Sequence, residues 1–94
     1  MVVAVCVIKI QLSGVSSLKG KRSILKSILK RLNNEFNVAV AEVNYHDIWQ
    51  TTEIGVATVG TSAGYVQGRL EKVVSWIEDN RPDVYIEAYK IELR

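Results

Sequence analysis

Cysteine and histidine are almost absent from this sequence, which has Cys6 and His46 and no other residue of either type. A single cysteine excludes an internal disulfide, and one cysteine with one histidine excludes the usual Cys/His zinc sites within one chain. We therefore expect no structural metal, and we expect no cofactor. Because Cys6 lies in an apolar run, we interpret it as a small buried hydrophobic residue rather than as a reactive thiol.

Long hydrophobic segments are missing as well. The apolar run that opens the sequence has no basic leader and ends at Lys9, so it is too short for a signal peptide or a membrane span. We therefore expect a cytoplasmic protein. The 94 residues are 48% hydrophobic and 23% charged, which predicts a single globular domain over residues 1–94.

Acidic residues are absent from the first third of the chain. Residues 1–34 contain seven lysines and arginines and no aspartate or glutamate, whereas residues 35–94 contain five basic and ten acidic side chains. The net charge of +2 therefore conceals two blocks of opposite sign. Such blocks indicate a directional surface field more than a general affinity for nucleic acid.

The spacing of apolar residues predicts six secondary-structure elements. Alternation and β-branched side chains are typical of strands, and apolar residues repeating every three to four positions are typical of helices. Ser16 or Ser17 is the expected cap of the first helix, and Asn33-Asn34 its expected end. In chain order the elements are a strand over 2–12, a helix over 18–34, strands over 35–45 and about 49–60, a helix whose entry is residues 61–64 and which ends before Pro82, and a strand over 84–93.

The order of these elements, βαββαβ, is not interrupted by a linker or a repeat. Two β-α-β units around a hairpin allow few right-handed topologies, and the ferredoxin-like sandwich is the commonest of them. We therefore predict an α+β fold in which a four-stranded antiparallel sheet carries both helices on one face. The other face of the sheet would be open.

An apolar patch is expected on that open face. Burial of Cys6, Ile8 and Ile10 would turn the alternate residues of the first strand outward. In the second strand, we expect Glu42 and Asn44 to face away from the helices, and the apolar residues of the same parity with them. Because an exposed apolar patch usually has a partner, we predict a homo-oligomer, most simply a dimer. The predicted interface residues are Val5, Val7, Val38 and Val40.

The first helix is the candidate binding element. Four of its basic residues fall on one stripe at 100° per residue, and Lys21 lies in the first turn, where free N–H groups favour an anion. A solvated amphipathic helix and a docking surface for an acidic protein remain alternatives. The residues predicted to contact an anion or RNA are Ser17, Lys19, Lys21, Arg22, Lys26 and Lys30.

No complete catalytic constellation is visible. Glu42, His46 and Asp47 resemble acid–base machinery, but no nucleophile, metal or oxyanion donor can be assigned to them. Asp47 is interpreted as a turn residue. RNA-recognition motifs of this fold stack bases on aromatics of the inner strands, but the first strand here has none and Trp49 lies away from the centre of the third.

Several short segments resemble the YlxP-like family. They are Ser17-Leu18-Lys19-Gly20-Lys21-Arg22, Phe36-Asn37-Val38, Ala41-Glu42, and Asp47 with Trp49-Gln50. This is a bacterial family of about this length whose domain is of unknown function. The resemblance implies a ferredoxin-like fold and no established activity, cofactor or catalytic residue. Genes of the family often lie beside translation-initiation and ribosome-maturation genes, which favours RNA or the ribosome as a partner.

Three functional hypotheses follow from the sequence. The first is a non-enzymatic, homo-oligomeric binding protein that meets RNA or a ribosomal surface through the basic helix. The second is a protein-interaction module that dimerises through the sheet and docks an acidic protein on the same helix. The third is a small enzyme of acyl or phosphoryl chemistry.

Overall fold

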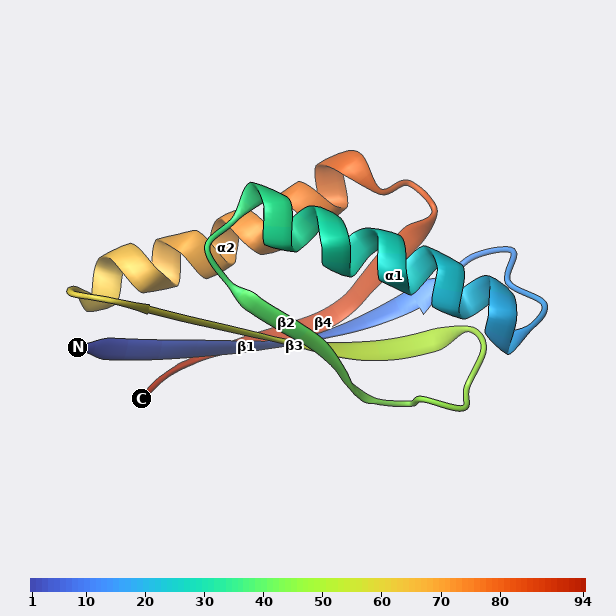
Figure 1. Cartoon of the computed structure of the whole chain (residues 1–94), viewed down its shortest axis with the longest axis horizontal. Helices are drawn as coiled ribbons and strands as arrows, with labels where there is room; N and C mark the ends of the chain where they lie inside the picture. Colours follow the sequence, from blue (N-terminus) through green and yellow to red (C-terminus); the bar gives the residue numbers. More distant parts are fainter.

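The computed structural model describes residues 1–94 and has the predicted element order (Figure 1). Five of the six elements begin and end within a residue or two of the expected positions, and the strand expected over residues 35–45 begins four residues later. The bounds are β1 Val2–Leu12, α1 Leu18–Glu35, β2 Ala39–Asn44, β3 Thr51–Gly60, α2 Ala63–Asn80 and β4 Val84–Leu93.

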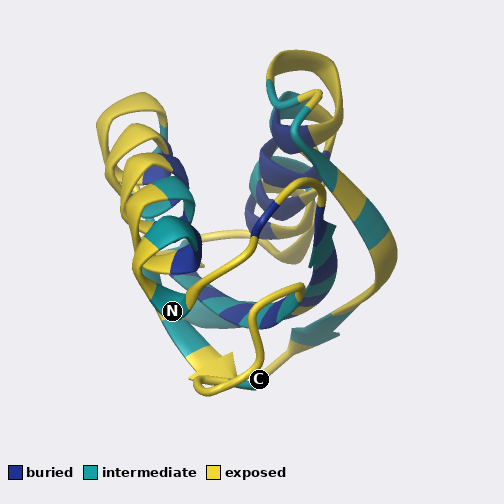
Figure 2. Cartoon of the chain, turned by 90° about the vertical axis from the view of Figure 1, so that its right-hand side faces the viewer, coloured by how far each residue is buried: buried dark blue, intermediate teal, exposed yellow.

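The four strands form one antiparallel sheet in the order β2-β3-β1-β4. The apolar β1 is therefore an inner strand and pairs with β3 on one side and β4 on the other, which fits a strand that is apolar on both faces. Both helices cover the same face of the sheet, and the opposite face carries no element (Figure 2). This arrangement confirms the ferredoxin-like α+β fold.

The hydrophobic core lies between the sheet and the two helices. Alternate residues of β1 point into it, among them Cys6, Ile8 and Ile10, and α2 contributes a stripe at helical spacing from Val66 to Ile77. The helix α2 packs against β1, β3 and β4, whereas α1 lies over the edge strand β2. No helix combines the length and the apolar character needed to cross a membrane.

The connection between α1 and β2 differs from the prediction. The helix continues through Asn33-Asn34 to Glu35, and the N–H of Phe36 closes it by donating to the carbonyl of Leu32 at 3.0 Å. Residues 36–38 were predicted to be strand, but Val38 donates back to the carbonyl of Phe36 in a tight turn. Because Phe36 packs against the core, this turn anchors the chain before β2 begins at Ala39.

Candidate functional site

A row of exposed cations runs along α1. It consists of Lys19, Arg22, Lys26 and Lys30, which recur every three or four residues and so share one side of the helix. None of the four forms an ion pair. At 1.5 Å per residue the row is about 16 Å long. We call these four residues the basic row; no carboxylate of the chain lies within ion-pair distance of them.

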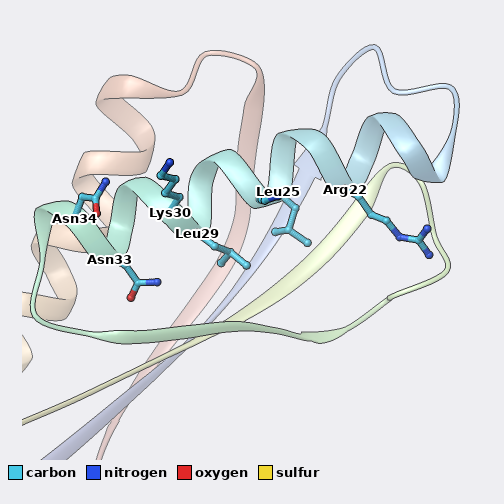
Figure 3. A pocket seen from close by; sticks show the side chains of 7 residues that line it. Arg22, Leu25, Leu29, Lys30, Asn33 and Asn34 are labelled. Carbon is cyan, nitrogen blue, oxygen red and sulfur yellow. The ribbon is translucent and has the colours of Figure 1, made fainter.

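A shallow groove of about 460 Å³ accompanies the basic row. Leu25 and Leu29 supply its apolar part, and Asn33 and Asn34 place two amides at its far end. In Figure 3, Leu25, Leu29 and Asn33 point from α1 toward the side on which β2 lies, while Lys30 points away from the sheet. The groove therefore joins cations, an apolar surface and hydrogen-bonding amides, which are the groups that phosphates, base faces and base edges require.

Lys21 was predicted to contact an anion, and the structure contradicts this. Its side chain is 1% exposed, and its ammonium lies 3.0 Å from the Glu42 carboxylate and donates to the carbonyl of Tyr45. A lysine is almost never fully buried unless it is paired, and here the pair spans α1 and β2. Lys21 therefore holds the fold together and does not belong to the basic row.

The buried pair is part of a small polar network. The Glu42 side chain is 14% exposed, and its carboxylate also accepts a hydrogen bond from the hydroxyl of buried Thr52 on β3. No buried side-chain nitrogen or oxygen of the chain lacks a hydrogen-bond partner. The network thus satisfies its charges internally, which is the condition under which an ion pair is tolerated in a core.

The remaining polar candidates lie apart from one another. Ser17 caps α1, and its hydroxyl oxygen accepts from the N–H of Gly20 at 3.0 Å. His46 and Asp47 are exposed in the connection between β2 and β3, whereas the Glu42 carboxylate faces the helices. The structure therefore does not bring Glu42, His46 and Asp47 together. No group of three or more His, Cys, Asp or Glu side chains is placed to hold a metal ion.

The open face of the sheet carries the predicted residues of β1 but not those of the second strand. Val5 and Val7 point outward, opposite to Cys6 and Ile8. Val38 and Val40, in contrast, pack against the core on the helix side, and Val40 is paired with buried Val56. The assumption that Glu42 faces solvent had reversed the parity of this strand, because Glu42 instead turns inward to meet Lys21.

A shallow apolar hollow of about 320 Å³ occupies the centre of the open face. It exists because neighbouring positions of β2 and β3 carry very small side chains beside the valines. The outward residues that line it are Val5, Val7, Ala39, Ala41, Val43, Gly55 and Ala57. A period-two pattern of small residues in 39–41 and 55–57 is the signal that sequence reasoning overlooked.

Charges of both signs flank the hollow on the side of β4 and at one end of β1 and β3. Lys9 contacts Glu87 at 3.5 Å, Lys90 contacts Glu92 at 3.2 Å, and Arg94 contacts Glu92 at 3.3 Å. Glu53 lies opposite Lys9 in the register of β1 and β3. The open face therefore has three basic and three acidic residues beside an apolar centre, in contrast to the basic row, whose four cations form no ion pair.

The thiol of Cys6 is expected to be unreactive in the folded protein. Burial raises its pKa from 9.0 to about 11, against a smaller opposing effect of the backbone at Lys90. The thiolate is the reactive species. At pH 8, the rate at which a disulfide reagent modifies Cys6 should therefore be about two orders of magnitude lower in the native protein than in the urea-unfolded chain. Equal rates in buffer and in urea would contradict the assignment of Cys6 to the core.

Comparison with known proteins shows which family the chain belongs to. A family model described as "Protein of unknown function (DUF503)" matches residues 3–91. Uncharacterized protein YlxP of Bacillus subtilis (strain 168) is 43% identical over 68 residues, which cover 72% of this chain and 73% of that protein. These matches confirm the resemblance seen in the sequence, and the chain belongs to the YlxP-like family, whose domain is DUF503.

Proposed function

We propose that the protein is a non-enzymatic, cytoplasmic RNA-binding protein that holds the phosphate backbone on the basic row of α1. The observation that carries this proposal is the absence of any ion-pair partner for Lys19, Arg22, Lys26 and Lys30. A helix that is merely soluble mixes charges of both signs on its exposed side. Cations kept free at regular spacing instead suit a polyanion.

In this function the basic row positions the RNA strand more than it selects a sequence. Lysine and arginine contacts to phosphates fix the register of a strand and release its counterions. The groove beside the row offers the half-buried Leu29 as an apolar surface and Asn33 as a hydrogen-bonding group. Base contacts, where they occur, would therefore be made in the groove while phosphates follow the row.

The test is the salt dependence of binding to a fluorescently labelled oligoribonucleotide, measured by anisotropy. Four phosphate contacts predict a slope of about −3 for the logarithm of the association constant against the logarithm of salt concentration on a single strand. Combined Lys19→Ala, Arg22→Ala and Lys26→Ala should reduce that slope to about −1, because only Lys30 remains.

Lys72→Ala is the matched control, because Lys72 is also an exposed helical lysine without an ion pair but lies on α2. Its slope and affinity should stay close to those of the unmodified protein. Alanine favours helix, so circular dichroism of the triple variant should be unchanged. Binding that ignores salt, or that survives the triple substitution, would reject the proposal. Capture of an acidic protein that persists after nuclease treatment would favour the protein-docking alternative.

A second function is favoured by the open sheet face, which we propose to be a homodimer interface. The hollow lined by Ala41, Gly55 and Val7 is apolar, and the surrounding charges are balanced. A strongly charged partner gains little on such a surface, whereas a second copy offers the same apolar centre and charges of both signs that can pair across a two-fold axis. Dimerisation would leave both basic rows free, since they lie on the other side of the sheet.

A further inference from the structure

The connection between β2 and β3 exposes two large apolar side chains. Ile48 is 48% exposed and Trp49, one of the two tryptophans of the chain, is 44% exposed. Neither residue belongs to the hydrophobic core or packs against it. Exposed tryptophan is unusual away from contact surfaces, because the indole offers much area for burial in a partner.

The connection is held in one conformation at both ends. Tyr45 adopts a positive φ of 64°, and its N–H donates to the side-chain oxygen of Asn44 at 2.9 Å. Its carbonyl accepts from the N–H of Ile48 at 3.1 Å. At the other end, the N–H of Leu12 donates to the carbonyl of Gln50 at 2.7 Å. Trp49 is therefore presented between two fixed points, so that less conformational freedom is lost when a ligand stacks on it.

The same connection is joined to the start of α1. Lys21 donates to the carbonyl of Tyr45, and Lys21 lies in the turns that carry Lys19 and Arg22 on their exposed side. Figure 1 shows the β2–β3 connection and the first turns of α1 at the same end of the molecule. In Figure 3, Arg22 reaches from α1 toward that end. The connection that carries Trp49 thus lies at the end of the molecule where the basic row begins.

We propose that Trp49 is a base-stacking platform at the start of the basic row, and that the RNA bound there is single-stranded. This inference rests on the proposed function and specifies its ligand. Bases within a duplex are stacked on one another and do not offer their faces, whereas an unpaired strand can place a base on the indole. Every base has such a face, so the site would tolerate different sequences.

The test uses the full chain with Trp76→Phe, which leaves Trp49 as the sole tryptophan. An oligouridylate strand should quench the Trp49 emission as it binds, and an RNA duplex of the same length should not. Trp49→Ala should weaken single-strand binding by about tenfold and leave the salt slope unchanged, because stacking involves no counterion. Trp49→Phe retains an aromatic face and should recover most of the affinity.

The possible results separate this inference from the proposed function. If the strand binds with a salt slope of about −3 while Trp49 emission is unchanged and Trp49→Ala binds normally, the stacking platform is rejected and the basic row stands. Stronger quenching by duplex than by single strand would also reject it. If neither RNA binds at low salt, both proposals fall together.

Discussion

Replacing Lys21 with methionine is expected to lower the free energy of unfolding by about 3–5 kcal/mol. The substitution leaves the Glu42 carboxylate, with 14% of its side chain exposed, without its cation. It also removes the donor to the Tyr45 carbonyl. For a domain of this size the midpoint of thermal unfolding should fall by about 15 °C or more, which differential scanning calorimetry would measure.

The loss should arise from the uncompensated charge rather than from the pair's own attraction. Replacing both partners, as Lys21→Met with Glu42→Leu, should therefore restore most of the stability, because an apolar pair of similar volume is often as good as a buried ion pair. The hydroxyl of Thr52 would lose its acceptor in the double variant, so recovery should be incomplete. A double-mutant cycle gives the coupling between the two positions.

Lys26→Met is the matched control, since it makes the same change on an exposed turn of α1. It should alter the free energy of unfolding by less than about 0.5 kcal/mol. If the Lys21→Met and Lys26→Met proteins unfold at the same temperature, the buried ion pair does not contribute to stability. RNA binding should show the reverse order: Lys26→Met should weaken it and Lys21→Met should not, because only Lys26 belongs to the basic row.

The fold was predictable because its elements are locally encoded. Alternation in β1 and β4 and the stripe from Val66 to Ile77 in α2 each indicate one structure over their whole length. The segment at 36–38 was not predictable in this way. Its apolar residues suit a strand, and its turn is decided by the packing of Phe36 against distant residues.

The sites were predictable only where burial follows from neighbours in the sequence. Val5 and Val7 were placed correctly because the alternate residues of β1 are plainly core. Lys21 and Glu42 were both expected at the surface, and each is buried only because of the other, 21 positions away in the chain. Because of this one non-local contact, Lys21 does not belong to the candidate site, and β2 turns to solvent the face that was expected to meet the helices.

Replacing Ala41 with lysine is expected to convert the proposed homodimer into monomers. Ala41 is an outward residue of the hollow and is paired with Gly55. A lysine there would place a charge in an apolar contact, and two-fold symmetry would repeat the penalty in the second copy. At about 2 kcal/mol per copy the dissociation constant rises about 1000-fold, which sedimentation at several concentrations would resolve.

Two further variants test which face of β2 lies in the proposed dimer contact. Ser75→Lys introduces the same side chain on an exposed position of α2 and should leave the mass in solution unchanged. Val40→Ala should lower the unfolding temperature, because Val40 packs on the core, yet leave the protein dimeric. Reversal of this pattern, with Ala41→Lys still dimeric and Val40→Ala monomeric, would place the contact on the helix side or at the sheet edge. A monomer before any substitution would leave the hollow without its proposed occupant and reject the homodimer directly.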